Sequence, residues 1–455
     1  MRSVITIGFT GLCLLVAIGA CVGDDPTTSS SSSSTSSGGG ASSSGNNATS
    51  SSGNASSSGT TTCPGNTTDA CGATCKKCET PTGGTVACTN GECVGACSAD
   101  ATLCGAACVD TKANKDNCGK CGHSCGGANC VASACQPITV ANFTAVTGIA
   151  ASPKGIVMAA DGEVNLCTKA EGCTAGTSLT SIKSGVSQLN SVTVSTIGTT
   201  STVFWDGNEG DSEIVYSCPL DGCPAGIPNK PSNVINDSIG RVIAGPNTVV
   251  WTRYQSYYGP YSAKCTPPNC ADEAAVRPKP ATGPYYQDTA REQSVPSTIF
   301  SVGATKTIWA TGGLYNDYNK QLRYCTYGVS CATPSEIDRG QFSNVKALAY
   351  FNGLHYVAMG NNASGETIGS ISDATPATPT PLVGDGQGIT ALAVDASGLY
   401  WTNGTTGKIL RCATLAGCAG SGEALVTGEA GAKHIAVDDK FVYWATDTVV
   451  KKVAK

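Results

Sequence analysis

The feature that most restricts the fold of this chain is an internal repeat in its C-terminal two thirds. The two clearest copies run over residues 389–427 and 434–453, and they place Trp401 and Trp444 43 residues apart. Each copy contains short runs of Val, Ile, Leu, Thr and aromatic residues between turns rich in Gly, Asn and Asp, a pattern typical of β-strands. A repeat of a few tens of residues indicates one supersecondary unit per copy. We therefore expect a series of small, similar β-sheets.

Five looser copies precede these two. Their central strands lie at residues 156–158, 203–205, 249–251, 307–309 and 355–357. Five of the seven central strands are followed by a cysteine pair of nearly fixed spacing: Cys167/Cys173, Cys218/Cys223, Cys265/Cys270, Cys325/Cys331 and Cys412/Cys418. We expect each pair to form a disulfide that closes the hairpin between the third and fourth strands of its unit. Each closure contributes about 2 kcal/mol through the entropy lost by the unfolded chain.

Four short strands in roughly 40 to 50 residues are typical of a propeller blade. Seven copies therefore predict an all-β fold, a seven-bladed β-propeller over residues 136–455, with a six-bladed ring as the alternative. The last copy stops after its third strand, whereas residues 137–143 form an apolar strand ahead of the first copy. We expect this strand to complete the seventh blade and close the ring.

The motif Tyr400-Trp401-Thr402-Asn403 resembles the YWTD and NHL families of β-propellers. The resemblance is confined to the last copies, and those families typically have six blades. It implies a propeller fold.

Residues 63–135 form a different kind of segment, with 14 cysteines and few large apolar side chains. Such a segment cannot build much of a hydrophobic core and needs covalent cross-links. Its stretch from Cys108-Val109-Asp110 to Cys125 resembles the "CVD...NCGxCGxxC" repeats of bacterial surface lipoproteins, which have no assigned activity. The alternative to disulfides is zinc, because Cys75/Cys78 and Cys118/Cys121 form two CxxC pairs. Disulfides account for all the cysteines, so we expect a disulfide-rich module.

The N-terminus indicates export and lipid anchoring. A short positive start is followed by an apolar run and by small residues that end at Cys21, as in a secretory signal. This junction resembles the bacterial lipobox, which implies a signal peptide over residues 1–20, a lipid on Cys21 and a membrane as partner. Val22, where an Asp would favour the inner membrane, indicates the outer membrane or the cell surface. An ordinary signal peptide cut elsewhere, or an uncut anchor helix, is the alternative.

Residues 21–62 are predicted to be a disordered linker. From residue 26 onward they contain Ser, Thr, Gly, Asn, Ala and one Pro, with no apolar side chain larger than Ala. Nothing there can offset the entropy lost on ordering the backbone.

The sequence predicts no catalytic residue, metal or cofactor. His123, His355 and His434 are scattered, and the last two occupy strand positions, where we expect structural histidines. The acidic stretch 206–213 could offer oxygen ligands to calcium, but it lacks EF-hand spacing and is better interpreted as a solvated loop. A net charge of −5 and an isoelectric point near 5.3 argue against nucleic acid as a partner.

Tyrosine is unevenly distributed, with eight of the fifteen between residues 254 and 318. Seven of these are predicted to form a ligand-binding rim above the third and fourth blades: Tyr254, Tyr257, Tyr258, Tyr285, Tyr286, Tyr315 and Tyr318; Tyr261 lies nearby. Exposed tyrosines suit carbohydrate or peptide ligands, although long loops also pack their own aromatics. We therefore expect a non-enzymatic recognition protein. The alternatives are a propeller lyase or hydrolase and a structural envelope component.

Overall fold

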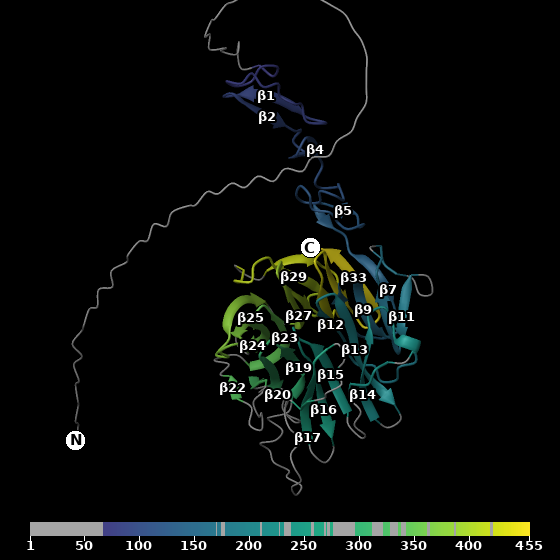
Figure 1. Ribbon diagram of the computed structural model, residues 1–455. Coiled ribbons are helices and arrows are strands. Elements are labelled where there is room, and N and C mark those ends of the chain that lie inside the picture. Colours follow the sequence, from purple (N-terminus) through teal and green to yellow (C-terminus); the bar gives the residue numbers. More distant parts are fainter. Residues whose placement is uncertain are drawn as a thin grey trace, which may run out of the picture. The chain divides into compact units, whose positions relative to one another are not determined.

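The computed structural model describes most of the chain from Thr67 to Lys455 (Figure 1). The described residues are 67–169, 171–173, 178–209, 212–226, 228–231, 238–255, 259–267, 270, 274–275, 296–311, 322–327, 335–337, 343–361, 365–385, 388–418 and 422–455. The predicted signal peptide, Cys21 and the linker lie outside them. Within the described ranges, no helix is long and apolar enough to cross a membrane.

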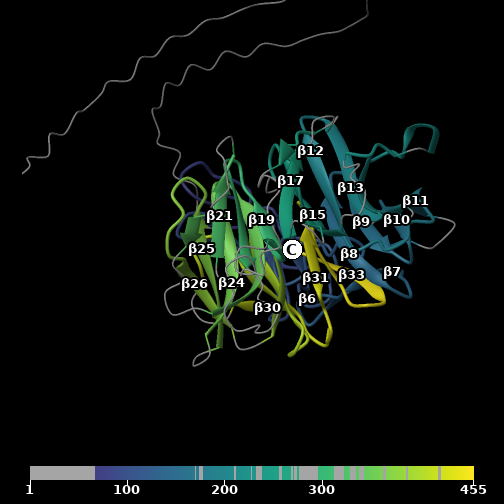
Figure 2. The same cartoon turned by 90° about the horizontal axis from the view of Figure 1, so that it is seen from below.

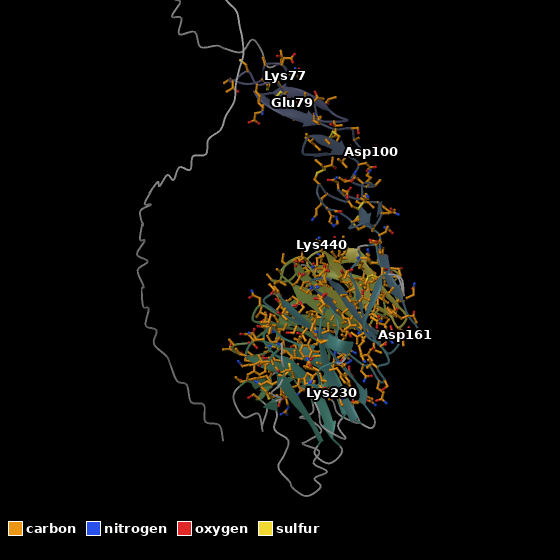
Figure 3. All side chains as sticks on the ribbon, turned by 45° about the vertical axis from the view of Figure 1, so that its right-hand side comes forward. Lys77, Glu79, Asp100, Asp161, Lys230 and Lys440 are labelled. Carbon is orange, nitrogen blue, oxygen red and sulfur yellow. A yellow bond between two sulfur atoms is a disulfide. The ribbon has the colours of Figure 1, made fainter. Side chains whose placement is uncertain are left out.

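Three short hairpins form the Cys-rich module, which is residues 67–135 of the described chain. Their strands are β1 (Thr85–Thr89), β2 (Glu92–Ala96), β3 (Thr102–Cys104), β4 (Ala107–Val109), β5 (Cys130–Val131) and β6 (Ala134–Cys135). The disulfides are Cys71–Cys88, Cys78–Cys93, Cys97–Cys108, Cys104–Cys121, Cys118–Cys130 and Cys125–Cys135. Figure 3 shows Lys77, Glu79 and Asp100 on this module.

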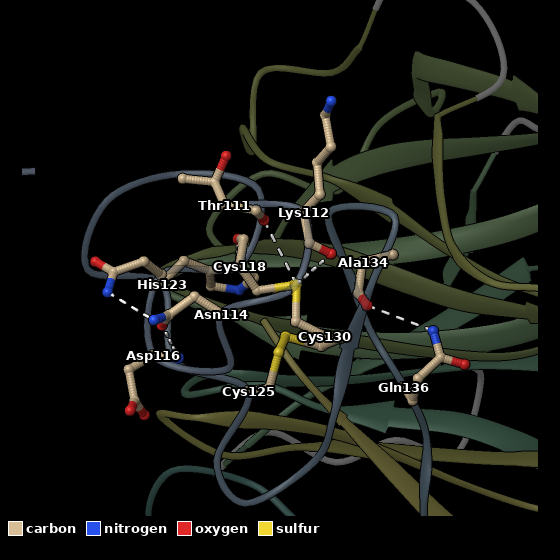
Figure 4. Close-up of a disulfide and its surroundings, with 12 residues drawn as sticks. Thr111, Lys112, Asn114, Asp116, Cys118, His123, Cys125, Cys130, Ala134 and Gln136 are labelled. Atoms are coloured by element: carbon tan, nitrogen blue, oxygen red, sulfur yellow. Dashed lines mark hydrogen bonds between the residues drawn. A yellow bond between two sulfur atoms is a disulfide. The ribbon is translucent and has the colours of Figure 1, made fainter. Parts of the chain in front are cut away.

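Cysteines make up most of the buried side chains of the module. Figure 4 shows its second half, where the Sγ of Cys130 lies 3.5 Å from the carbonyl oxygen of Thr111 and 3.4 Å from that of Lys112. A sulfur in a disulfide carries no hydrogen, so these are packing contacts. The disulfides thus take the place of a hydrophobic core, as the composition predicted.

The zinc alternative is wrong for the described cysteines. Two groups of three have sulfur atoms within 4.8 Å of one another, Cys71/Cys78/Cys93 and Cys118/Cys125/Cys135. All six are bonded to another sulfur, and Cys75 is disulfide-bonded as well. Because zinc binds thiolates, these sulfurs are not available to it.

The propeller consists of seven antiparallel sheets, and the blades are numbered here in chain order. Blade 1 is β8 (Val146–Ser152), β9 (Gly155–Ala160), β10 (Glu163–Cys167) and β11 (Leu179–Lys183); blade 2 is β12 (Val192–Ile197), β13 (Thr200–Glu209) and β14 (Ser212–Pro219), followed by the 3₁₀ helix η1 (Pro224–Gly226); blade 3 is β15 (Ser238–Ala244), β16 (Val249–Gln255), β17 (Gly259–Cys265) and β18 (Ala274–Ala275). Blade 4 is β19 (Pro296–Val302), β20 (Lys306–Thr311), β21 (Leu322–Thr326) and β22 (Ser335–Ile337); blade 5 is β23 (Ser343–Phe351), β24 (Leu354–Asn361), β25 (Gly365–Ser372) and β26 (Thr380–Asp385); blade 6 is β27 (Ile389–Asp395), β28 (Gly398–Asn403), β29 (Lys408–Cys412) and β30 (Glu423–Val426); blade 7 is β31 (His434–Val437), β32 (Phe441–Ala445), β33 (Val449–Ala454) and β7 (Ile138–Asn142).

The first strands of the blades form the inner ring of the propeller. Each contacts the first strand of the next blade, and β31 of blade 7 contacts β8 of blade 1. In Figure 2 several first strands, such as β15 and β31, lie near the middle, whereas β11 and β26 lie at the periphery. The predicted seven-bladed propeller is therefore confirmed, and the six-bladed alternative is wrong.

The second strand of each blade carries its largest buried side chain. All five tryptophans of the chain lie on second strands and are at most 2% exposed: Trp205, Trp251, Trp309, Trp401 and Trp444. Met158 and Tyr356 are fully buried on the second strands of blades 1 and 5. Burying a large aromatic ring stabilises a fold by on the order of 4 kcal/mol. Packing between blades therefore depends on the residue type that defined the repeat.

The ring closes where the first propeller strand joins the last blade. Strand β7 pairs antiparallel with β33, with Asn142 opposite Val449 and Ile138 opposite Lys452. We call β7 and β33 the closure pair. The prediction that residues 137–143 complete the seventh blade is confirmed. Because β7 and β33 are far apart in the chain, this pairing is the non-covalent junction of the ring.

A disulfide hairpin of blade 1 supports the closure pair from outside. In the loop closed by Cys167 and Cys173, the N–H of Cys173 donates to the carbonyl oxygen of Val140 in β7 at 2.7 Å. Gly172 has φ +102°, and a Cβ there would lie 2.4 Å from the carbonyl oxygen of Thr139. Only glycine therefore allows the hairpin to approach β7 so closely.

We predict that Cys167→Ser/Cys173→Ser destabilises the propeller more than Cys412→Ser/Cys418→Ser does. Both disulfides have a sequence separation of 6, so the entropic loss of about 2 kcal/mol is the same for each pair. Only the first loop donates a hydrogen bond to the closure pair, which adds about 1 kcal/mol. Urea unfolding of the two double variants measures the difference. Equal losses would show that the blade 1 hairpin does not support closure.

Candidate functional site

A cleft of about 480 Å³ lies between blades 7 and 1. Its walls are the turn between β8 and β9, residues 151–156, and the turn between β31 and β32, residues 437–441. Both connect a first strand to a second strand, so they emerge on the same face of the propeller. We call this concavity the blade 7–1 cleft. Its volume lies in the range of about 300–1,000 Å³ that is usual for small-molecule sites.

The floor of the cleft combines two aromatic rings with a buried ammonium group. Lys452 is 3% exposed, its Nζ lies 4.4 Å from the ring centre of Phe441, and it donates to the carbonyl oxygen of Lys169 at 3.1 Å. Burial lowers the pKa of Lys452, while the charges of Asp438 and Glu171 oppose that shift. The ammonium thus lies over an aromatic face, where the attraction between a cation and a ring stabilises it.

Asp438 organises the turn of blade 7. Its Oδ1 accepts the N–H groups of Lys440 and Phe441, both at 2.8 Å, and its Oδ2 accepts the hydroxyl of Tyr443 at 2.8 Å. Burial and the neighbouring carboxylate raise the pKa of Tyr443, so the phenol stays protonated and donates. The turn is therefore held in a fixed shape by one carboxylate.

The rim of the cleft carries exposed charges of both signs. Lys154, Asp439 and Lys440 are exposed cleft residues, and Lys440 lies at the propeller surface in Figure 3. Lys154 also forms an ion pair with Asp221. A rim of ammonium and carboxylate groups above a partly aromatic floor suits a polar, multidentate ligand such as a glycan or a peptide backbone.

A buried network of polar side chains connects blades 4 and 5. His355 in β24 is fully buried, with Nε2 at 3.0 Å from Oδ1 of Asp373 and Nδ1 at 2.7 Å from Oγ of Ser301 in β19. A carboxylate can only accept, so Nε2 carries the proton, and Nδ1 of the neutral ring accepts from the Ser301 hydroxyl. Burial lowers the pKa of His355, although Asp373 opposes that shift, so the ring stays neutral.

Asp373 is the acceptor at the centre of this network. Its Oδ2 accepts the N–H and hydroxyl of Thr305 at 2.9 and 2.8 Å, and Oδ1 accepts the N–H of Lys306 at 3.1 Å. Burial by itself would raise the pKa of Asp373, but the hydrogen bonds from His355 and Thr305 outweigh it and hold the pKa at about 2. The carboxylate is therefore ionised at neutral pH.

Ser301, His355 and Asp373 are residue types found in hydrolase triads, but their placement is structural. Ser301 is 2% exposed and Asp373 is 4% exposed. A nucleophile must reach its substrate, and the partners of this serine enclose it. The expectation of a structural histidine thus holds for His355, which is hydrogen-bonded at both ring nitrogens. His434 lies instead at the wall of the central channel.

The interpretation of the acidic stretch 206–213 as a solvated loop is wrong at Asp206. Asp206 lies within β13 and is fully buried, and its Oδ1 accepts the N–H of Ser191 at 2.6 Å and the Ser191 hydroxyl at 2.9 Å. Burial raises its pKa to about 6, against the effect of these hydrogen bonds. The alternation of the strand continued through residues that the sequence alone indicated as a turn.

The structure brings together the members of four of the five predicted cysteine pairs: Cys167–Cys173, Cys218–Cys223, Cys265–Cys270 and Cys412–Cys418. Cys325 is disulfide-bonded, and Cys331 lies outside the described residues. Of the seven predicted rim tyrosines, only the backbone of Tyr254 in β16 belongs to the described chain; outside it lie Tyr257, Tyr258, Tyr285, Tyr286, Tyr315 and Tyr318. The tyrosine rim stays a prediction.

Sequence reasoning missed the blade 7–1 cleft and the Asp373 network. The only sequence signal for the cleft was the turn 437–441, because its other wall comes from the opposite end of the propeller sequence. The members of the Asp373 network come from two blades and have no fixed spacing. The available sequence signal for the network was His355, a histidine on a second strand at a position where other blades carry aromatic residues.

No protein-family model and no curated protein matches the chain. Its fold is similar to solved structures at low identity. The WD40 β-propeller domain of Doa1 is 10% identical, with 70% of this chain and 97% of that one covered and a TM-score of 0.46. A gluconolactonase from Xanthomonas campestris is 9% identical, with 70% of this chain and 89% of that one covered and a TM-score of 0.40. A nidogen/laminin complex is 11% identical, with 55% of this chain and 86% of that one covered and a TM-score of 0.35. The strand order described above establishes the propeller independently of these likenesses.

We predict that Asp373→Asn lowers the free energy of unfolding by about 1–3 kcal/mol at neutral pH, because an amide nitrogen then faces buried donors. The folded pKa of about 2 lies below the ordinary 3.8. The carboxylate therefore stabilises the fold above about pH 4, and this contribution is lost as the pH falls through about 2.

Urea unfolding of wild type and Asp373→Asn at pH 7 and pH 2.5 measures this effect, and the stability difference should shrink at the lower pH. Asp439→Asn, at an exposed position, is the matched control and should change little at either pH. A difference that is the same at both pH values would contradict the assigned role of Asp373.

Proposed function

We propose that this chain is an exported, lipid-anchored binding protein whose propeller presents a site for a carbohydrate or a peptide. The observation that carries the proposal is the blade 7–1 cleft. It combines a turn fixed by Asp438, an aromatic floor with the Lys452 ammonium, and exposed charges at its rim. Concave sites with a few fixed polar groups are typical of ligand recognition.

The anchoring part of the proposal rests on the N-terminal sequence and on the disulfides. Disulfides persist in oxidising compartments outside the cytoplasm, and ten disulfides are present among the described cysteines. Cys21, at the end of the apolar run, would carry the lipid, and the Ser-rich segment up to residue 62 would keep the folded part away from the membrane. We place the protein at the outer membrane or cell surface of a bacterium.

The tyrosine-rich loops are a second candidate surface within the same function. On the blade assignment, residues 256–258 connect the second and third strands of blade 3, and residues 312–321 do so in blade 4. These loops lie outside the described residues. The two candidate surfaces share no residue, so they can be separated by mutation.

We predict that a glycan and peptide array probed with the Cys21→Ser chain gives saturable hits that depend on the cleft. Lys154→Glu/Lys440→Glu reverses two rim charges and should weaken those hits about tenfold or more, because hydrogen bonds from charged donors are the strong ones. Lys408→Glu, at an exposed position of β29, is the control and should retain the affinity.

Tyr257→Ala/Tyr258→Ala tests the predicted tyrosine rim in the same array. Loss of binding in this variant alone would move the site to the tyrosine rim and contradict the cleft assignment. Hits that survive both double variants, or an array without saturable hits, would contradict the proposed function.

We also predict that Cys21→Ser releases the chain from membranes. Several acyl chains at about 0.8 kcal/mol per buried methylene would hold the parent protein durably, whereas serine accepts no thioether-linked lipid. Detergent-free fractionation of cells that express each form measures the soluble share, with Cys13→Ser in the apolar run as the control. Equal membrane retention of parent and Cys21→Ser would exclude a lipid anchor at this position.

A further inference from the structure

The central channel of the propeller contains a cavity of about 140 Å³. Its walls come from the inner ring, with residues from the first strands of blades 1, 3, 4, 5 and 6, together with residues 433–435 of blade 7. It is separate from the blade 7–1 cleft, and the two share no lining residue. The volume admits a few water molecules, or one small ion or ionic group.

Basic side chains from three blades line this cavity. They are Arg241 in β15, Lys346 in β23, and Lys433 with His434 at the start of β31. None of the described residues that line it is acidic. A narrow channel with low-dielectric walls concentrates the field of such charges. The cavity is therefore a region of positive potential inside an acidic protein.

Among the residues that the structure describes, two carboxylates lie close enough to offset part of this charge. Asp447 accepts Nζ of Lys433 at 2.6 Å, but both side chains are more than half exposed, so the pair is weak. Asp206, in β13, interacts with the charge of Arg241, but its Oδ1 already accepts a hydrogen bond from the N–H of Ser191. Among the residues that the structure describes, no ion pair involves Lys346. Lys346 therefore brings to the cavity a positive charge that no described ion pair offsets.

The positive charges at the cavity affect the pKa of His434. Burial and the charges of Arg241 and Lys433 lower the pKa of His434, and against the opposing effect of Asp447 they bring it to about 4. The imidazole is therefore neutral at pH 7 and offers a hydrogen-bond donor without adding charge.

We propose that the central channel binds a small oxyanion, or the terminal oxyanion of a larger ligand, between Arg241, Lys346 and His434. The guanidinium provides paired donors that match a carboxylate or phosphate, and the ammonium provides a point charge. The site size limits the ligand to a group such as a carboxylate, phosphate or sulfate. This oxyanion binding is independent of the proposed ligand recognition at the blade 7–1 cleft.

Isothermal titration of the Cys21→Ser chain with inorganic phosphate, sulfate and galacturonate tests the proposal. We expect saturable binding of at least one of them, and the three probes separate a phosphate or sulfate ligand from a sugar carboxylate. Lys346→Met should weaken binding about tenfold or more, and Lys346→Arg should retain most of it, since the charge remains. Lys408→Met, at an exposed position of β29, is the matched control and should leave the affinity within about twofold.

NMR titration of the His434 ring provides a second readout. A bound oxyanion neutralises the field of Arg241 and Lys433, so the titration midpoint of His434 should move to higher pH in its presence. Absence of saturable binding with all three probes, or equal affinity in Lys346→Met and wild type, would overturn the proposal. Lys154→Glu/Lys440→Glu should bind the channel probes normally, so failure here and failure at the cleft are distinguishable.

Discussion

The pairing of β7 with β33 is the interaction on which the rest of the propeller depends. Neighbouring blades are joined by the chain itself, but the circle is completed only by these two strands. An open ring would expose the backbone groups of β33 as an edge that other chains can pair with. It would also uncover the side of β8 that contacts β31. Two further contacts lie next to this pair. The disulfide hairpin of blade 1 is hydrogen-bonded to Val140 in β7. In the Cys-rich module, His123 Nε2 lies 2.6 Å from the carbonyl oxygen of Lys455, which follows β33.

Buried polar groups provide a second layer of connection between blades. His355 contacts Ser301 in the neighbouring blade, and Asp373 accepts hydrogen bonds from Thr305 there. Glu429, which lies between blades 6 and 7, accepts hydrogen bonds through Oε2 from Trp444 Nε1 and from Lys451 Nζ, both at 3.1 Å. A buried carboxylate is costly unless its donors are correctly placed. These carboxylates therefore favour one register between blades, whereas the packing of apolar side chains alone would tolerate small shifts.

Features that recur in several blades could be predicted from the sequence, whereas sites that combine residues of different blades could not. Trp401 and Trp444 identified the second strands, and the cysteine pairs located the ends of the third strands, because each feature recurs at the same place in five of the seven blades. The incomplete last copy predicted the closure pair through its missing strand. The blade 7–1 cleft, the Asp373 network and the basic residues of the channel each combine residues from different blades. Their distances depend on the curvature of the ring, which no local spacing encodes. Asp206 was misinterpreted because an acidic residue in a strand has the same sequence appearance as one in a turn.

Closure between the first and last strands also has a consequence for the order of folding. In the export that we propose, the chain crosses the membrane from its N-terminus and presents β7 long before β33, so β7 has no partner while six blades emerge. The cysteines that flank β7, Cys135 in the module and Cys173 in blade 1, bond to near neighbours that are already present. Oxidation can therefore fix both sides of the waiting strand early. The last step joins residues at opposite ends of the propeller and carries the largest loop-closure entropy, so we expect ring completion to be the slowest step of folding.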